Sequence, residues 1–174
     1  MPLTALKEEA DSQTSGQTIG DLLRVEQIRC NADASSKKRA LELISDLIAS
    51  NGSELQCRSV LELLLAREKL GSTALGHGVA LPHGRCADLT EAIIVFLKLN
   101  TGVDFDAPDE QPVDLIVGLL VPEECNESHL QLLAQLAELF SQESIRKELR
   151  DHVSASQVHE IFNRIAAAPP ASAS

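Results

Sequence analysis

Two stretches of almost uninterrupted apolar residues constrain the fold of this chain more than any other feature. They are AIIVFLKL at 92–99 and VDLIVGLLVP at 113–122. A strand with one face in water alternates apolar and polar residues, whereas a strand covered on both faces reads as a continuous apolar run. We therefore expect these two segments to be strands of a sheet that has helices on both sides.

The N-terminal half supplies the first helices and two short strands. Apolar residues recur at helical spacing through SSKKRALELISDLIAS at 35–50, and a second helix is expected at about 57–68. RVEQIRC at 24–30 and GVAL at 78–81 fit short strands. This order of segments is typical of a protein in which helices pack on the faces of one β-sheet.

The C-terminal part reads as helical. Ser128 with Gln131, and Ser154 with Gln157, match the capping box that opens a helix, and QESIRKELR between them predicts a short helix. The chain as a whole therefore predicts a single-domain α/β sandwich with a mixed sheet flanked by helices. We expect the folded domain to span 18–166, with flexible tails at 1–17 and 167–174.

Composition excludes several classes of partner. The formal net charge of −11 opposes nucleic-acid phosphates and anionic lipid, and a chain with no Trp or Tyr has little with which to stack on bases. No apolar run is long enough for a membrane span, and the N-terminus does not resemble a secretion signal. The four cysteines are widely spaced, without a CxxC pair, so we expect reduced thiols in a cytoplasmic protein.

The most unusual segment is GSTALGHGVALPHGR at 71–85, which contains two of the five histidines. Its glycines permit close approach of a ligand to backbone N–H groups, and Pro82 fixes the conformation that leads into His83. A dinucleotide or P-loop site lacks its required residues here. His77, His83 and Cys86 offer three metal ligands, and an inert surface loop is the simplest alternative.

A histidine that acts as the reactive group is a further interpretation. A neutral imidazole nitrogen attacks a phosphoryl group directly, and such a site needs donors and positive charge for the phosphoryl oxygens. His129 follows Ser128 in the first turn of a predicted helix, where anions are favoured. Arg67 ends the helix that precedes the glycine-rich loop and carries a planar set of donors. Both residues also have ordinary structural roles at helix ends.

Three segments together resemble one known family. LLAREKLGSTALGHGVALPHGR, FDAPDEQPVDLIVGLLVP and SHLQLLAQLAELF, within residues 19–165, are similar to the enzyme IIA domain of the mannitol/fructose type in the bacterial phosphotransferase system. The similarity is greatest to its stand-alone nitrogen-regulatory branch. The resemblance implies a mixed sheet flanked by helices, phosphorylation of His83, and His129 and Arg67 beside the phosphoryl group. His77 departs from the family pattern, in which Asn is more usual.

The resemblance also implies a function. His83 would accept a phosphoryl group from an HPr-like phosphocarrier, with no cofactor and no metal, and would form a covalent phosphohistidine. The chain carries no second domain with a reactive cysteine and no membrane span, which favours a regulator read by target proteins, potassium-transport regulators among them. The alternatives are a sugar-transport IIA that donates to a IIB protein, a metal-dependent hydrolase using His77, His83 and Cys86, and a binding module with an inert histidine.

Overall fold

The computed structural model describes residues 19–51, 57–124, 127–152 and 154–167. The elements, in chain order, are α2 (Ile19–Leu22), the 3-10 helix η1 (Val25–Gln27), β1 (Ile28–Ala32), α3 (Lys37–Asn51), α4 (Cys57–Lys69), β2 (Ala74–Gly76), β3 (Val79–Ala80), β4 (His83–Cys86), β5 (Ile93–Val103), β6 (Val113–Pro122), α5 (Glu127–Phe140), α6 (Glu143–Asp151) and α7 (Ala155–Ala167).

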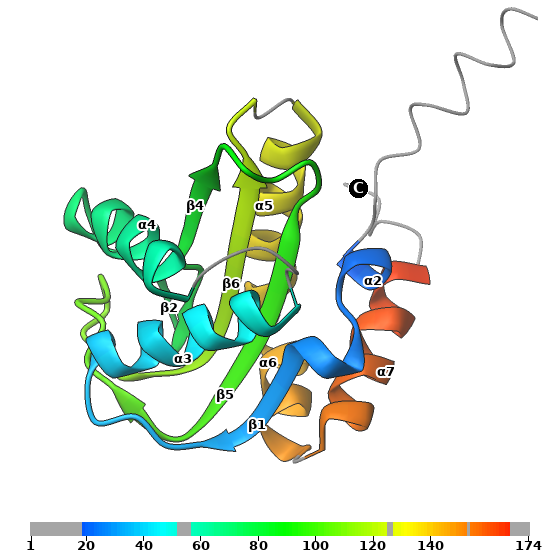
Figure 1. The fold of residues 1–174 in the computed structure, drawn as a ribbon. Coiled ribbons are helices and arrows are strands. Elements are labelled where there is room, and N and C mark those ends of the chain that lie inside the picture. Colours follow the sequence, from blue (N-terminus) through cyan, green and yellow to red (C-terminus); the bar gives the residue numbers. More distant parts are fainter. Residues whose placement is uncertain (1–18, 52–56, 125–126, 153, 168–174) are drawn as a thin grey trace, which may run out of the picture.

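The strands form one mixed sheet, as the sequence predicts (Figure 1). Its order is β1-β5-β6-β3-β2, and β4 also pairs with β6. The long central pair, β5 and β6, is antiparallel, while β1 runs parallel to β5 and both β3 and β4 run parallel to β6. Strand β2 is antiparallel to β3. The two apolar runs are therefore the centre of the sheet.

Strands β3 and β4 occupy the same edge of β6 one after the other. Val79 pairs with Leu115 and His83 pairs with Leu119, so both short strands keep one register. Pro82 lies in the break between them and has no N–H to donate to a ladder. Its carbonyl oxygen accepts a hydrogen bond from the Leu119 N–H at 3.0 Å. One extended segment, interrupted at its proline, thus delivers His83 to the sheet.

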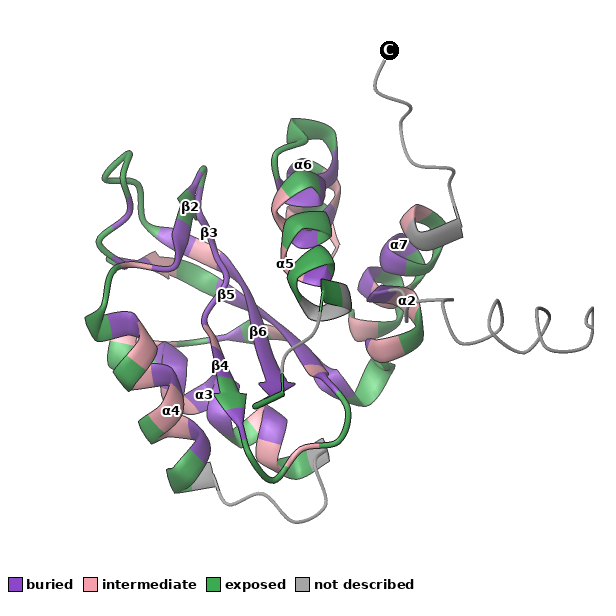
Figure 2. Cartoon of the chain, turned by 90° about the horizontal axis from the view of Figure 1, so that it is seen from above, coloured by how far each residue is buried: buried purple, intermediate pink, exposed green. Residues whose placement is uncertain are grey.

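Helices cover both faces of this sheet. Helices α3 and α4 lie on one face, and α5, α6, α7 and α2 lie on the other (Figures 1 and 2). Alternate residues of β6 enter the two cores: Leu115, Val117 and Leu119 pack on the α5 side, and Ile116 and Leu120 pack on the α3 side. This double burial explains why the β6 sequence has no polar alternation.

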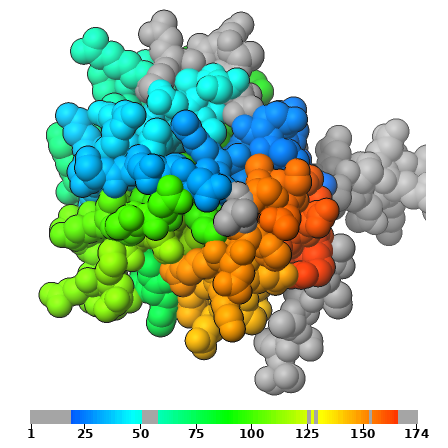
Figure 3. Space-filling model, turned by 90° about the horizontal axis from the view of Figure 1, so that it is seen from below, coloured from blue at the N-terminus to red at the C-terminus, as the bar shows by residue number. Residues whose placement is uncertain are grey.

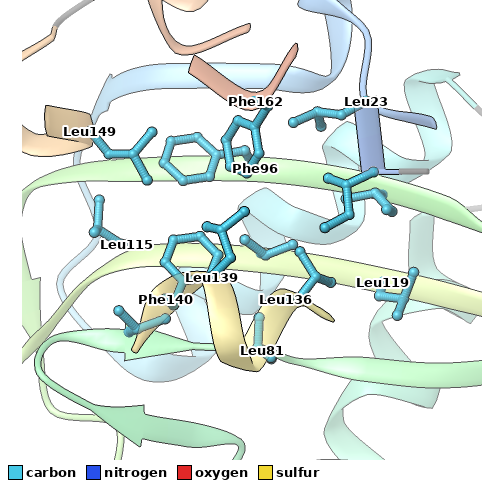
Figure 4. Packing of buried hydrophobic residues seen from close by; sticks show 14 of the residues in the cluster. Leu23, Leu81, Phe96, Leu115, Leu119, Leu136, Leu139, Phe140, Leu149 and Phe162 are labelled. Carbon is cyan, nitrogen blue, oxygen red and sulfur yellow. The ribbon is translucent and has the colours of Figure 1, made fainter. Parts of the chain in front are cut away.

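The core on the α5 side is built partly from aromatic rings (Figure 4). Phe162 of α7 meets Phe96 of β5 edge-on, with ring centroids 5.6 Å apart, and meets Phe140 of α5 at 6.3 Å. These contacts attach the last helix to the sheet. In the space-filling view, α7 lies against the N-terminal segments of the folded part (Figure 3). The two ends of the domain therefore pack together.

Several predicted element boundaries are wrong. The segment 24–30 is not one strand, because Val25–Gln27 forms η1 and β1 begins only at Ile28. The predicted strand at 78–81 is reduced to Val79–Ala80, and β2 and β4 have no counterpart in the prediction. Helix α5 begins at Glu127, one residue before the predicted cap Ser128. Helix ends fray, so the residue at which a helix is assigned to begin commonly shifts by one or two positions.

Other predicted boundaries are confirmed. Helices α3 and α4 match the expected segments, and a short α6 lies between α5 and α7. Ser154 caps α7, since its hydroxyl oxygen accepts from the Gln157 N–H at 3.2 Å. Apart from Ala167, the expected tails at 1–17 and 167–174 lie outside the described residues. Within the part of the chain that the structure describes, no helix has the length and apolarity needed to cross a bilayer.

Candidate functional site

His83 is the first residue of β4, and its imidazole is half-buried. The ring Nδ1 lies 2.7 Å from the carbonyl oxygen of Leu81. A carbonyl oxygen only accepts hydrogen bonds, so Nδ1 carries the hydrogen and donates it. In the neutral ring the other nitrogen, Nε2, then holds a lone pair. The backbone two residues upstream therefore selects the tautomer in which Nε2 is a nucleophile.

The side chain of His83 lies on the α5 face of the sheet. Its ladder partner is Leu119, whose side chain belongs to the core under α5. The next residue, Gly84, faces the other way, because a Cβ built there would lie 3.6 Å from the Cβ of Leu63 in α4. Alternation along the strand then returns Arg85 to the His83 side, where it is exposed. His83 and an exposed cation thus share one surface.

His129 lies in the first turn of α5. Its side chain is outside the described residues, but the helix that carries it is placed. Helix α5 packs on the face to which His83 points and begins shortly after β6 ends at Pro122. Figure 1 shows its first turn at the end of the sheet where β4 and β6 terminate. The backbone of His129 and the ring of His83 are therefore at the same end and on the same face of the sheet.

Arg67 has a local contact in this structure. It lies in the last turn of α4, and its Nη1 donates to the carbonyl oxygen of Gly71 at 3.0 Å. No hydrogen bond joins Arg67 to His83, both of which the structure describes. The contact with Gly71 closes the turn after α4, which is a structural role, and leaves Nε and Nη2 of the guanidinium available as donors.

His77 adopts a left-handed backbone conformation, with φ at +56°. Asn is one of the few residues besides glycine that adopt this conformation readily, so the backbone here would also suit the Asn that the resemblance leads one to expect. The His77 N–H donates to Asp109 Oδ2 at 2.7 Å, and its carbonyl oxygen accepts from Arg150 Nη2 at 2.7 Å. The N–H groups of His77 and Gln111 lower the pKa of the Asp109 carboxyl. The exposed His77 thus has a backbone role in a turn.

The three-ligand metal set suggested by the sequence is not assembled. The carbonyl oxygen of Gly78, the residue after His77, accepts from the Leu115 N–H of β6, whereas Cys86 pairs with Pro122 of the same strand. Leu115 and Pro122 are seven residues apart, which is roughly 23 Å along a strand. Cys86 also lies three positions from His83, on the opposite face of β4. Among the described residues, no group of three or more His, Cys, Asp or Glu side chains could hold a metal ion. This geometry removes the basis for the metal-dependent hydrolase.

A surface cavity of about 670 Å³ lies near His77, at the opposite end of β6 from His83. Its lining includes Asp114 and Arg150, whose side chains form an ion pair with a 2.8 Å contact. Because His83 pairs five residues further along β6 than Asp114, this cavity is remote from the His83 site. The two histidines of the glycine-rich segment therefore belong to two different regions of the surface.

Comparisons with known proteins agree with this fold. The family model described as phosphoenolpyruvate-dependent sugar phosphotransferase system, EIIA 2, matches residues 21–165. The chain is 42% identical over 146 residues to a nitrogen regulatory protein of Pseudomonas aeruginosa, covering 80% of this chain and 95% of that protein.

Solved structures give the same result. The crystal structure of nitrogen regulatory protein IIA-Ntr from Neisseria meningitidis superposes with a TM-score of 0.79 at 46% identity, over 83% of this chain and 98% of that one. The mannitol IIA of Escherichia coli superposes with a TM-score of 0.68 at 26% identity, over 80% of this chain and 97% of that one. The described architecture is therefore shared with both proteins.

Proposed function

Since the chain belongs to the EIIA 2 family of the phosphoenolpyruvate-dependent sugar phosphotransferase system, we propose that it is a phosphoryl-carrier regulatory protein that accepts its phosphoryl group on His83. The nitrogen-regulatory branch is favoured because the identity to such proteins is 42% and 46%, against 26% for mannitol IIA. Its phosphorylation state would be the signal that target proteins read.

The observation that carries the proposal is the hydrogen bond from His83 Nδ1 to Leu81 at 2.7 Å. It leaves the Nε2 lone pair to attack the phosphorus of a phosphohistidine on an HPr-like donor. The new Nε2–P bond forms as the donor's N–P bond breaks, and the donor imidazole takes back its electron pair. No proton has to be transferred, because the His83 ring keeps its hydrogen on Nδ1. Positive charge that develops on the ring strengthens the bond to Leu81.

His129 and Arg67 would hold the phosphoryl oxygens. The first turn of α5 offers backbone N–H groups that have no partner within the helix, together with the positive end of a helix dipole. Arg67 would contribute the donors that Gly71 does not occupy. Phosphoryl transfer depends mainly on positioning and on stabilisation of charge, so cations, imidazole and backbone donors are sufficient for this role.

The direct test is incubation with the general phosphotransfer proteins and phosphoenolpyruvate, followed by intact mass measurement. We expect one phosphoryl group on the wild-type protein and none on His83→Ala. The adduct should be labile in acid and stable in base, as N-phosphoryl imidazoles are. An adduct on His83→Ala would refute the assignment, and an acid-stable adduct would point to a hydroxyl such as Ser72 or Thr73.

The supporting residues are tested by transfer kinetics. His129→Ala should keep the acceptor but slow transfer by roughly a hundred- to a thousandfold, since the loss of one such donor costs about 2.7–4 kcal/mol in comparable sites. Arg67→Lys should also be slower, because lysine keeps the charge and loses the planar set of donors. Wild-type rates in either variant would remove that residue from the site.

The partners follow from the same proposal. The donor would be an HPr-like phosphocarrier in the cytoplasm, and the targets would be regulatory proteins, potassium-transport regulators among them. The alternative is a sugar-transport IIA that donates to a IIB protein. Mixing the phosphorylated protein with a fructose-type and a mannitol-type IIB separates the two, because rapid transfer to either IIB would favour the transport function.

A further inference from the structure

Glu68 is an acidic residue buried in the last turn of α4, with 5% of its side chain exposed. Three donors meet its carboxylate. Lys37 Nζ of α3 lies 2.7 Å from Oε1, the Thr73 N–H donates to Oε1 at 3.1 Å, and the Thr73 hydroxyl donates to Oε2 at 2.6 Å. A buried carboxylate is costly unless it is paired in this way. Glu68 is thus fixed, and it fixes Thr73 through two hydrogen bonds.

Thr73 is connected to the candidate nucleophile His83 through hydrogen bonds of Leu81. Its carbonyl oxygen accepts from the Leu81 N–H at 3.0 Å, and the Leu81 carbonyl oxygen accepts from His83 Nδ1 at 2.7 Å. Pro82, between the last two residues, is held by its own carbonyl contact with Leu119. The Lys37–Glu68 ion pair and the imidazole of His83 are therefore the two ends of one continuous set of contacts.

We propose that Glu68, held by Lys37, is a positioning residue for His83: it fixes Thr73 and Leu81 so that the Leu81 carbonyl keeps the hydrogen of the ring on Nδ1. Its effect on phosphoryl transfer rests on the proposed function, but its effect on the tautomer does not. Without a firmly placed acceptor at Nδ1, the hydrogen also occupies Nε2, and Nε2 then has no lone pair for attack.

The same contacts also connect the two layers of the molecule. Lys37 and Glu68 belong to α3 and α4, which cover the sheet face opposite to the one that His83 occupies. A helix pair on the far face therefore orients the ring through Thr73, just before β2, and Leu81, between β3 and β4. Lys37 Nζ also lies 3.2 Å from Asp106 Oδ2 and 5.1 Å from the centroid of the Phe105 ring, so its position does not depend on Glu68 alone.

The test uses the full chain labelled with 15N, in mildly alkaline buffer where imidazoles are neutral. Ring 1H–15N correlation spectra report which nitrogen of His83 carries the hydrogen. We expect the Nδ1–H form alone in the wild-type protein and a mixture of both forms in Glu68→Gln. The second-order rate of phosphoryl transfer to His83 should fall on the order of ten- to a hundredfold in this variant.

The matched control is Asp114→Asn. It also removes the carboxylate charge of an ion pair, that with Arg150, but at the far end of β6. Its His83 spectrum should equal that of the wild type, and its transfer rate should stay within about twofold. A merely structural role for Glu68 predicts lower stability in both variants, with the same His83 tautomer and the same transfer rate below the melting temperature.

A milder variant covers the case in which Glu68→Gln does not fold. Thr73→Val removes only the hydroxyl contact, and we expect a detectable Nε2–H form of His83 with a several-fold slower transfer. An unchanged tautomer in Glu68→Gln, or in Thr73→Val if the former does not fold, would overturn the inference. If the wild-type protein is not phosphorylated at all, the proposed function fails, while the spectra still decide the role of Glu68.

Discussion

Gly118, in the middle of β6, should not tolerate a methyl group. The strand is buried on both faces, and Gly118 pairs with Val95 of β5. A Cβ built at Gly118 would lie 2.4 Å from Cγ2 of Ile44 in α3 and 3.0 Å from Cγ2 of Val95. Both neighbours are fully buried, so they have no solvent-filled space into which to move. The glycine therefore allows α3 to approach the sheet closely.

The cost of Gly118→Ala follows from these distances. Ordinary contacts begin at 3.4 Å, so the Ile44 methyl would have to retreat by about 1 Å. Overpacking of this kind costs about 1–3 kcal/mol. The lower entropy of the unfolded chain returns about 0.4–1 kcal/mol, because the backbone of Gly118 is extended and an alanine can adopt it. The clash therefore dominates, and we expect a net loss of roughly 1–2 kcal/mol.

Thermal and denaturant unfolding measure this loss. For a protein of this size we expect the melting temperature of Gly118→Ala to fall by roughly 2–8 °C. The matched control is Gly84→Ala in β4, whose added Cβ meets Leu120 at an ordinary 3.5 Å, so its stability should equal or slightly exceed that of the wild type.

A double-mutant cycle isolates the contact with Ile44. Ile44→Ala alone should cost about 2–5 kcal/mol through the cavity that it leaves. Because the methyl group of an alanine at position 118 partly fills that cavity, the double variant should be less destabilised than the two single variants added together, by about 0.5–3 kcal/mol. Additive losses, or a fully stable Gly118→Ala, would refute the close approach of α3.

Three further predictions concern stability. Lys98→Met removes a buried ammonium that donates to two carbonyl oxygens at the C-terminal end of α6, those of Arg150 at 2.5 Å and His152 at 2.6 Å, and should cost about 2–4 kcal/mol in denaturant unfolding. The pKa of Asp109 is lowered by the His77 N–H, so its contribution is present above the unfolded pKa and is lost as the pH falls through the folded one. The free energy of unfolding of Asp109→Asn should therefore fall less steeply than that of the wild type as the pH is lowered. The same pH dependence in both proteins would contradict this. Ser154→Ala should lower the free energy of unfolding by about 1 kcal/mol, because the Gln157 N–H loses its acceptor. A denaturation midpoint of this variant equal to that of the wild type would show that the cap does not stabilise α7.

The sequence predicts the parts of the fold that depend on local periodicity. The apolar runs of β5 and β6 and the amphipathic helices are strong signals because burial on one or both faces dictates their pattern. Strand β4 gives no such signal: its residues HGRC have low strand propensity, and pairing with β6 creates the strand. A short edge strand of this kind depends on a partner more than thirty residues away.

The candidate site also has features that the sequence predicts and features that it does not. Pro82 and the glycines mark His83 as a fixed residue, and this can be read locally. The hydrogen bond that selects its tautomer cannot, because it needs the orientation of the Leu81 carbonyl. The positioning role of Glu68 cannot be read from the sequence either, because its ion-pair partner Lys37 lies 31 positions away along the chain. Arg67, its neighbour, attracts attention by its charge, although the contact seen in the structure is with Gly71.

The net charge of the protein limits how the proposed phosphorylation of His83 would be read by a target. A phosphoryl group adds about 1.5–2 negative charges to a chain whose formal net charge is already −11, so the long-range field changes little. At physiological ionic strength, exposed charges are screened beyond about 8 Å. A target that distinguishes the two states must therefore contact the surface close to His83, where the exposed Arg85 and the first turn of α5 lie. Because the ring is held in place from the far side of the sheet, that surface can differ between the states in charge and hydrogen bonding while its backbone stays the same, and recognition would then depend on electrostatic complementarity.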